Sequence, residues 1–576
     1  MMNRSHRLLV ILVGAFSLII TSGNWTQLHA AASAKIVVNQ VGYLPNSPKV
    51  ALLVNSDTSK QPIELVDSTT KQTVQIIIPS QPVRDRDSND RLQTIDFSQI
   101  QQQGKYFLRT GSIESYPFSI ASNVYQEPII KLLRSYYLQR CGVAIDDPVT
   151  GIRHAPCHLR DGAIAHKDPI NQAGKTIPAT GGWHDAGDYG KYVSTTAVTT
   201  GRLLSLYENN PKAFPDRQLT IPESGNGIPD LLDEMRVGLD WMLSMQRLDG
   251  AIYRKLSGKK WPSIVAPDED SLPRFIYGIS TPETAKFAAA MAIAARVYAP
   301  LQPQQSTLYL KAARRAWDYL QTQSMMKVDW VDGDDSGSGK YLASATDTEP
   351  SLKIDTDDRL WAAAELFITT RESQFDRYFL QHLPKFDYTL FEWKDPSALG
   401  IANYLSESQI PQSSQIKAKI AQQILNRADA LVKKVSTSGY HLANHRFIWG
   451  SNKMTATDGL TLILAYRLTD GTAYRQAAID QIDYLLGRNP FNQTFVTGIG
   501  THPVRHVNHI FARARKIDIP GLLVGGANND AQDGLAPKHR GILSYLDDDK
   551  SYATNEYAID YNAELIALMS LVAAQE

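Results

Sequence analysis

The sequence predicts a multidomain protein in which a small all-β sandwich precedes a much larger all-α domain. Short apolar runs separated by Gly, Pro and Asn fill residues 35–122, a pattern typical of strands joined by tight turns. From residue 123 onward, apolar residues recur at the spacing of amphipathic helices. The length of 576 residues also exceeds that of one ordinary domain.

Residues 1–34 are typical of a secretory signal peptide. Basic residues precede an apolar run over 8–20, and small residues suited to cleavage follow at Ala30 and Ala34. A membrane anchor is the alternative, but an apolar run of about a dozen residues is short for a bilayer span. We therefore expect a secreted or periplasmic protein with no membrane association after signal cleavage.

The first domain, residues 35–122, is expected to be an immunoglobulin-like sandwich, because many short strands follow one another closely. It contains no acid pair or ligand cluster, so we expect it to act as a scaffold. The expected strands are 37–41, 50–54, 63–66, 74–78, 92–97, 105–110 and 116–120.

The second domain, residues 123–576, is expected to be helical with long connections. Such connections in a compact domain are usually functional, and the loop around Gly182 and residues 495–540 are two of them. The expected helices are 125–140, 194–208, 229–247, 283–299, 305–324, 357–370, 415–434, 455–469, 471–487 and 556–574.

Charge and composition exclude some classes of function. Acidic and basic residues number 59 each and are interspersed along the chain. Proteins that bind nucleic acid normally carry a basic patch or stripe, so we expect no nucleic-acid partner. We also expect a monomer without an organic cofactor.

The loop 181–192 holds the first candidate catalytic residues. Asp185 and Asp188 lie three residues apart among glycines and directly after His184. Two neighbouring carboxylates push their pKa values apart, as acid–base chemistry requires. A solvated turn rich in Asp and Gly is the plainer alternative, and it is common in proteins.

Glu556 is the second candidate, at the point where an aromatic, polar loop enters an apolar helix. Partial burial there would raise its pKa and suit it to act as a general acid. The alternative is a carboxylate at a helix N-terminus, where the helix dipole would lower the pKa. The local sequence leaves both open.

Several motifs occur in the order found in one enzyme family. They are Gly-Trp-His-Asp-Ala-Gly-Asp-Tyr at 182–189, the segment 545–563 around Glu556, Tyr-Leu-Leu-Gly-Arg-Asn-Pro at 484–490, and the segments 447–452 and 495–500. Together they resemble the family 9 glycoside hydrolases, the cellulase-type enzymes. Asn39–Tyr43 resembles the immunoglobulin-like module that precedes many bacterial members. The resemblance covers the mature chain.

The resemblance implies an (α/α)6 barrel and an inverting glycoside hydrolase of the endoglucanase or cellulase type, which cleaves β-1,4-glucosidic bonds. It assigns the general base to Asp188, a supporting carboxylate to Asp185 and the general acid to Glu556. Inversion fits this pair if base and acid lie about 6.5–9.5 Å apart, leaving room for a water. A non-catalytic glycan-binding protein is a less favoured alternative, since a binder needs no acid and base.

Sugar faces are apolar and stack on aromatic rings, so aromatic residues of the matched loops are expected to bind substrate. Together with polar residues of these loops, the expected substrate-binding residues are Trp183, Tyr189, Trp449, Arg505, His509 and Tyr552.

One segment departs from the family pattern. Many members carry Pro-His-His-Arg here, whereas this chain has Asn508 in place of the first histidine and Ile510 in place of the arginine. The loss of a guanidinium removes a fixed set of donors to sugar hydroxyls. The departure favours, as an alternative, an exo-acting β-glucosidase or exo-β-glucosaminidase that acts on short oligosaccharides.

The two cysteines belong to a candidate metal site. Cys141, Cys157, His158 and His184 supply two thiolates and two imidazoles, a structural zinc set, and the resemblance implies zinc at these positions. The alternative is a Cys141–Cys157 disulfide, with His154 as a spare candidate ligand. A zinc-dependent hydrolase is disfavoured, because four protein ligands leave no position for water.

A calcium site is a weaker expectation. Glu223, Asn226 and Asp230 combine oxygen ligands with nearby glycines, and the family often binds calcium in this region. The alternative is a plain helix start, with Pro229 in the first turn and Asp230 favoured by the helix dipole.

Overall fold

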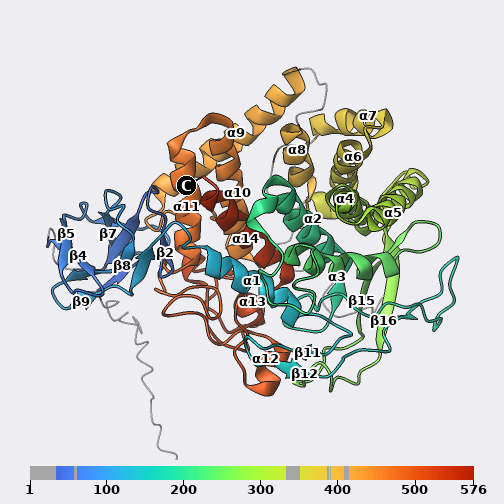
Figure 1. Ribbon diagram of the computed structural model, residues 1–576, viewed down its shortest axis with the longest axis horizontal. Helices are drawn as coiled ribbons and strands as arrows, with labels where there is room; N and C mark the ends of the chain where they lie inside the picture. Colours follow the sequence, from blue (N-terminus) through green and yellow to red (C-terminus); the bar gives the residue numbers. More distant parts are fainter. Residues whose placement is uncertain are drawn as a thin grey trace, which may run out of the picture. The chain divides into compact units, whose positions relative to one another are not determined.

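The structure is a computed structural model that describes residues 34–56, 61–331, 350–385, 388, 391–407 and 414–575 (Figure 1). The expected signal peptide lies outside the described residues except for its last position. Residues from Ala34 onward form one compact unit. No helix within the described ranges combines the length and apolar character needed to cross a bilayer.

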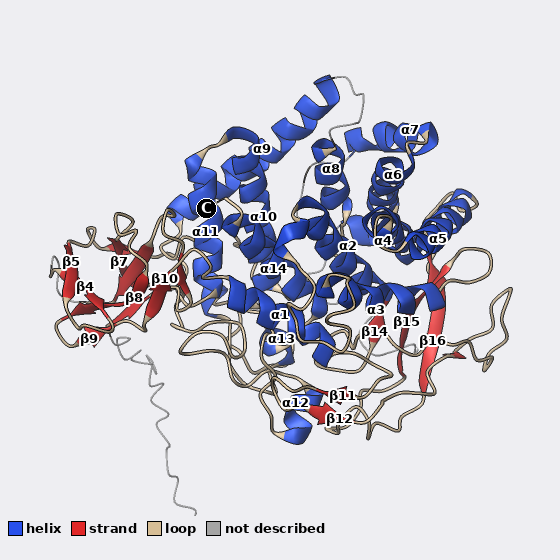
Figure 2. Cartoon of the chain, viewed as in Figure 1, coloured by secondary structure: helices blue, strands red, loops and turns tan. Residues whose placement is uncertain are grey.

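The N-terminal domain is a sandwich of two sheets, as expected (Figure 2). One sheet has the order β1-β3-β7-β6, and the other has the order β2-β10-β8-β4-β5 with β9 paired to β8. The strands are β1 (Lys35–Val37), β2 (Gly42–Tyr43), β3 (Val50–Val54), β4 (Ile63–Asp67), β5 (Thr73–Ile77), β6 (Val83–Arg84), β7 (Arg91–Asp96), β8 (Gly104–Thr110), β9 (Ile113–Glu114) and β10 (Phe118–Ile120).

Strand β3 is apolar throughout because its two faces belong to different cores. Ala51 and Leu53 point into the core of the sandwich. Leu52 and Val54 belong to the large core of the helical domain. Since side chains alternate along a strand, a strand buried on both faces reads as a continuous apolar run.

The C-terminal domain is built from helices. Those of ten residues or more are α1 (Gln126–Leu138), α2 (Val193–Asn209), α3 (Asp230–Ser244), α4 (Thr281–Tyr298), α5 (Pro303–Gln321), α6 (Thr356–Thr370), α7 (Ser373–His382), α8 (Ser397–Ser406), α9 (Ser414–Thr437), α10 (Ser451–Thr469), α11 (Thr472–Leu485) and α14 (Ile559–Ala573). Two short helices are α12 (Ile510–Arg515) and α13 (Tyr552–Asn555).

The long helices form an inner and an outer layer. Helix α14 packs against α10 and α2, α2 packs against α4, α4 against α6, and α6 against α8, so these six form the inner layer. The outer helices α1, α3, α5, α7, α9 and α11 each pack on an inner one. Inner and outer helices alternate along most of the chain, as an (α/α)6 barrel requires.

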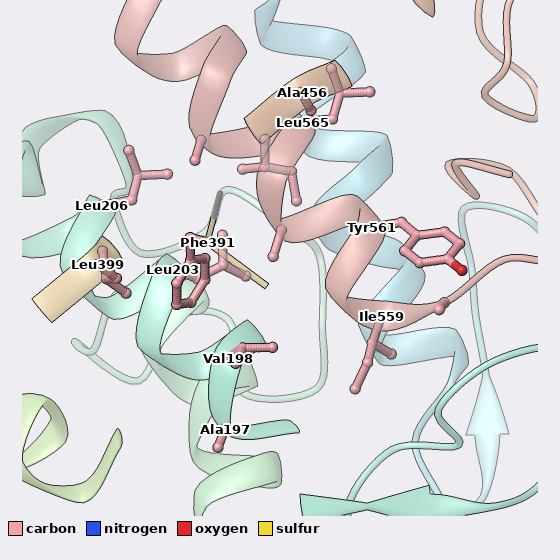
Figure 3. Close-up of a cluster of buried hydrophobic side chains, with 14 of the residues drawn as sticks. Ala197, Val198, Leu203, Leu206, Phe391, Leu399, Ala456, Ile559, Tyr561 and Leu565 are labelled. Atoms are coloured by element: carbon pink, nitrogen blue, oxygen red, sulfur yellow. The ribbon is translucent and has the colours of Figure 1, made fainter. Parts of the chain in front are cut away.

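The inner helices meet in a dense apolar core. Figure 3 shows side chains of α2, α10 and α14 converging with those of α8 and the segment before it, among them Leu203, Phe391, Ala456 and Leu565. The N-terminal ends of α2 and α14 directly follow the segments that carry Asp188 and Glu556. The barrel thereby brings the two catalytic candidates to the same end.

Several features differ from the expectation, among them the helices α7, α8, α12 and α13, which the sequence did not predict. The helix expected over 556–574 begins only at Ile559, so Glu556 lies before it. The helical domain also contains a β-sheet that the sequence did not predict, of order β13-β16-β15-β14. Its strands are β13 (Ala163–Ile164), β14 (Lys191–Tyr192), β15 (Ile252–Gly258) and β16 (Arg274–Ser280), while β11 (Ile145–Asp146) pairs with β12 (Arg153–His154).

Candidate functional site

The loop 181–192 presents Asp185 and Asp188 in one tight turn. The Asp185 N–H donates to the carbonyl oxygen of Gly190 at 2.9 Å, and the Gly190 N–H donates to Asp188 Oδ2 at 3.0 Å. Gly182 has a φ of 75°, and a Cβ there would lie 2.7 Å from a buried indole. Only glycine fits such a position, so the sequence of the loop dictates its close packing.

The segment that carries Glu556 lies beside this loop. The Ile559 N–H donates to the carbonyl oxygen of Asp185 at 2.8 Å. A Cβ on Gly187 would lie 3.2 Å from Glu556 Oε1 and 2.1 Å from the carbonyl oxygen of Asn508. Residue 187 must therefore be glycine, because the Asn508 backbone leaves no room for a Cβ at this position. The barrel thus brings together the three carboxyls that the sequence predicted to cooperate.

Asp185 and Asp188 are both nearly buried, but they differ in electrostatics. Burial raises the pKa of Asp185 well above its usual range, and the nearby Asp560 and Asp188 raise it further against a hydrogen bond from Thr195. Burial also raises the pKa of Asp188, but the Gly190 N–H and the Arg274 guanidinium oppose that rise. Asp188 is therefore the better stabilised of the two as an anion.

Glu556 has the electrostatics of an acid rather than of a helix-terminal carboxylate. It follows the short helix α13 in an extended conformation with φ −82° and ψ 142°. Burial raises its pKa well above the usual range, and the charges of Asp188 and Asp185 raise it further. The Gly187 N–H bonds to the carboxyl and only partly opposes these effects. The alternative of a pKa lowered by a helix dipole is wrong.

Cys141, Cys157, His158 and His184 come together as one cluster, in which the candidate ligand atoms all lie within 4.8 Å of one another. The two Sγ atoms are 3.9 Å apart, and the two ring nitrogens, His158 Nδ1 and His184 Nε2, are 3.3 Å apart. The sulfur–nitrogen distances are 3.6 Å for Cys141 to His158 and 3.8 Å for Cys157 to His184.

These distances match a tetrahedral metal site. Zinc bonds of the usual length require about 3.8 Å between two sulfurs, about 3.5 Å between sulfur and nitrogen, and about 3.3 Å between two nitrogens. The sulfurs are far beyond the roughly 2.05 Å of a disulfide, and both cysteines are free. The four residues therefore fit a metal, and His154, whose Nδ1 instead contacts the Ala155 carbonyl oxygen, is outside the set.

Partners within the protein occupy the three residues expected to bind calcium. Both oxygens of Glu223 bind the Arg140 guanidinium at 2.9 and 3.0 Å. Asp230 accepts from the Leu219 N–H at 2.6 Å, and Asn226 Nδ2 donates to Asp233 at 3.1 Å. Asp230 begins α3, as the helix-start alternative holds. The calcium site stays a prediction.

Two of the residues expected to bind sugar are instead part of the core. Trp183 is fully buried, and its Nε1 donates to Glu234 Oε1 at 2.8 Å. Tyr189 is 2% exposed, and its hydroxyl donates to the carbonyl oxygen of Val265 at 2.6 Å. Neither ring can stack on a sugar, so both expectations were wrong. Tyr192, a third aromatic residue of the loop, instead lies near the carboxyls, and burial together with their charges raises the pKa of its hydroxyl.

Trp449 and Tyr552 remain suited to substrate. Their ring centroids are 5.9 Å apart with an interplanar angle of 34°, and Tyr552 is 42% exposed. The Trp449 side chain also hydrogen-bonds to Tyr561, whose hydroxyl experiences the charge of Glu556. This aromatic pair, in which Tyr552 is exposed and Trp449 is half-buried, therefore lies near the acid.

Of the two polar residues expected to bind substrate, one is exposed and the other is buried. Arg505 is exposed, and its backbone N–H donates to Asp547 at 3.2 Å. His509 is buried, and its Nε2 contacts Gln139 Oε1 at 2.9 Å. Burial lowers the pKa of His509 to about 3, so it is a neutral, internal side chain. The expectation that it contacts substrate was wrong.

Sequence reasoning missed the residues that brace the loop. Gln139 Nε2 donates to the carbonyl oxygen of Ala186 at 2.9 Å. The backbone carbonyl oxygen of Gln139 accepts from the His184 N–H at 2.8 Å. Thr195 donates its hydroxyl proton to Asp185 Oδ1. Such polar residues have no motif of their own, because their role depends on contacts between distant segments.

Comparisons with known proteins agree with this geometry. Residues 125–569 match the model of glycosyl hydrolase family 9, and residues 31–115 match that of the cellulase N-terminal ig-like domain. Endoglucanase D of Acetivibrio thermocellus is 31% identical over 546 residues, which cover 92% of this chain and 82% of that protein.

Solved structures are also similar. A metagenome-derived glycoside hydrolase family 9 endoglucanase has a TM-score of 0.88 at 41% identity, covering 94% of this chain and 99% of that one. A Zn-binding triple mutant of the family 9 endoglucanase J30 has a TM-score of 0.86 at 36% identity, covering 92% and 99%. The expected fold, an immunoglobulin-like sandwich followed by an (α/α)6 barrel, is confirmed.

Proposed function

The chain belongs to glycosyl hydrolase family 9, and on that premise we propose that it hydrolyses β-1,4-glucosidic bonds of a β-glucan with inversion. The cluster of Asp185, Asp188 and Glu556 around Gly187 carries this proposal. The endoglucanase activity named for its relatives supports cleavage within the glucan chain.

In the proposed reaction, Asp188 accepts a proton from a water molecule as the water oxygen attacks the anomeric carbon. The bond from this carbon to the glycosidic oxygen breaks, and Glu556 donates its proton to that departing oxygen. Asp185 helps to hold the water, and its hydroxyl donor Thr195 fixes its orientation. Attack on the face opposite the leaving group inverts the anomeric configuration.

The electrostatics suit these roles. Burial and two neighbouring carboxyls raise the pKa of Glu556, which favours its protonated form. Asp188 receives the Gly190 N–H and experiences the Arg274 charge, which favour its anion. When the environments of two carboxyls give them different pKa values, the group with the higher pKa acts as the acid and the other acts as the base.

The test compares two substrates with wild type and Glu556→Gln. We expect the variant to lose about 10²–10⁴-fold of its kcat on cellotetraose, because the leaving alkoxide needs a proton. On dinitrophenyl cellobioside, whose phenolate leaves without a proton, kcat of the variant should fall far less. Equal losses on both substrates, or near-normal turnover of cellotetraose, would remove the acid assignment.

Short-chain, exo-acting hydrolysis is the second candidate, and the departure at residues 508–510 favours it. Ile510 is buried, and Asn508 Nδ2 donates to the carbonyl oxygen of Asp549 at 2.6 Å. Neither side chain supplies the charged donor that the family arginine offers. Release of a single sugar size from cellohexaose would identify an exo enzyme, and cleavage of chitosan oligosaccharides would identify an amino-sugar substrate.

The metal proposed for the cysteine–histidine cluster is zinc. Thiolate and imidazole ligands in a tetrahedral set suit zinc, and a related solved structure is described as Zn-binding. Four protein ligands would leave no open position on the ion, so its role would be to hold the loop 181–192 at His184. Elemental analysis of the purified protein should find one zinc per chain, and its absence together with no free thiols would favour a disulfide.

Export is proposed from the leader sequence alone. Mass spectrometry of the protein recovered outside the cytoplasm should show a mature chain that begins between residues 31 and 35. We propose a monomer, and sedimentation analysis checks this.

A further inference from the structure

The ring of His158 has a partner on each side. Its Nδ1 faces the cysteine–histidine cluster, 3.6 Å from Cys141 Sγ and 3.3 Å from His184 Nε2. Its Nε2 faces Asp270 Oδ2 at 3.3 Å. The His158 and Asp270 side chains are 1% and 5% exposed, so water does not compete for this contact.

Metal binding fixes the direction of this hydrogen bond. An imidazole that binds a metal through Nδ1 offers that lone pair and keeps its proton on Nε2. With a metal bound at Nδ1, the Nε2–H of His158 would therefore donate to Asp270. The Leu272 N–H donates to the other oxygen of Asp270 at 3.1 Å, which orients the carboxylate toward the ring. Carboxylates placed in this way orient metal-binding histidines and increase their basicity.

Asp270 belongs to the segment 259–273, which joins β15 to β16 and also contacts the loop 181–192, here called the catalytic loop. The Tyr189 hydroxyl donates to the carbonyl oxygen of Val265 in this segment at 2.6 Å. Directly after it, Arg274 Nη1 donates to the carbonyl oxygen of Tyr189 at 2.6 Å. The segment therefore touches the catalytic loop beside Asp188.

These contacts close a ring through the metal site. The catalytic loop contributes His184 to the cluster, and the His184 ring contacts the His158 ring. The other side of the His158 ring contacts Asp270. From Asp270 the segment 259–273 returns to the catalytic loop at Tyr189. A metal bound at the cluster would thus hold the loop at two points, directly through His184 and indirectly through Asp270.

We propose that Asp270 is a positioning residue of the metal centre, and that through it the bound metal fixes the segment 259–273 against the catalytic loop. This inference rests on the proposed zinc site. It predicts that removal of the metal loosens both the cluster and a segment that contributes no ligand.

The test measures Zn²⁺ affinity in the full-length protein by competition with a chromophoric chelator. Loss of a carboxylate that orients a metal-binding histidine weakens binding about 10–100-fold, and we expect this for Asp270→Ala. Asp270→Asn, which keeps an acceptor oxygen, should fall between Asp270→Ala and wild type. Asp268→Ala is the matched control, because Asp268 lies in the same segment and accepts from the Ala155 N–H at 3.2 Å; its affinity should stay within about twofold of wild type.

A second measurement follows the segment itself. Hydrogen exchange at 261–272 should accelerate in wild type when zinc is removed, and it should be fast in Asp270→Ala even with zinc bound. The inference would be overturned, with the zinc site left intact, if Asp270→Ala bound Zn²⁺ as tightly as wild type does. It would also be overturned if hydrogen exchange at 261–272 were the same with and without zinc. A wild-type protein that binds no zinc would overturn both.

Discussion

The two segments that supply the catalytic carboxyls differ in the contacts that hold them in place. The loop 181–192 is braced by hydrogen bonds from Gln139 and Thr195 and enters the metal cluster at His184. Glu556 lies on a short extended stretch and approaches the Gly187 backbone. Their electrostatics differ as well: the Gly190 N–H and the Arg274 charge favour the anion of Asp188, whereas burial and two neighbouring carboxyls favour the protonated form of Glu556.

The largest expected effect separates base from acid. Asp188→Asn removes the group that accepts the proton of the water, so kcat should fall about 10²–10⁴-fold. Because every substrate needs that water, the loss should be similar for cellotetraose and for dinitrophenyl cellobioside, unlike the loss in Glu556→Gln. Steady-state kinetics on both substrates check this, and a loss confined to cellotetraose would contradict the assignment of Asp188 as base.

A large effect on stability is expected at the metal cluster. A bound metal present at about 1,000 times its Kd stabilises the folded state by about 4 kcal/mol, and His184→Ala should lose most of that and part of the activity. Thermal unfolding with and without a chelator measures the loss. His154→Ala is the control, since His154 is not one of the four clustered residues, and its unfolding should respond to the chelator as wild type does. A stable, zinc-loaded His184→Ala protein would show that the loop is held in another way.

The acid should reduce stability in a way that depends on pH. The folded state raises the pKa of Glu556 above the ordinary value of 4.5, so the fold binds this proton more tightly than the unfolded chain does. Stability is therefore lost as pH rises from the ordinary value toward the raised one, by about 1.4 kcal/mol for each unit of pKa shift.

Glu556→Gln cannot ionise and should escape that loss. Its melting temperature should match wild type near pH 4 and exceed it at pH 8. A variant that is less stable at pH 8 than at pH 4, relative to wild type, would contradict the raised pKa.

The smallest expected effect concerns the aromatic pair of Trp449 and Tyr552. Stacking on one ring contributes about 0.5–1.5 kcal/mol, so Tyr552→Ala should raise KM several-fold with little change in kcat. Trp183→Phe is the contrasting variant, because the buried indole touches Glu234 rather than solvent, and it should lower the melting temperature while leaving KM unchanged. The reverse pattern would mean that the two rings have exchanged roles.

The sequence predicted the location of the site because its motifs mark loops in which close packing requires glycine, as at Gly182 and Gly187. It could not tell which side of a loop each residue faces. Within 183–189, Asp185 and Asp188 lie in the carboxylate cluster, whereas Trp183 and Tyr189 face the core. That division depends on packing against α3 and on the segment 259–273, both distant in sequence.

The β15–β16 hairpin escaped prediction for a related reason. Strand β15 contains Arg254 and Lys255, and both are buried, so no alternation of polar and apolar residues marks the strand. These cations lie close to the Trp330 ring, at 4.5 and 5.7 Å from its centroid. Because Trp330 is far from both residues in the sequence, no local pattern predicts these contacts.

The proposed reaction requires Asp188 and Glu556 to act on opposite faces of a β-1,4-glucosidic bond. Proton NMR of the first product released from cellohexaose tests it most directly. We expect the new reducing end to appear as the α-anomer and only later to equilibrate with the β-anomer. Initial release of the β-anomer would contradict it.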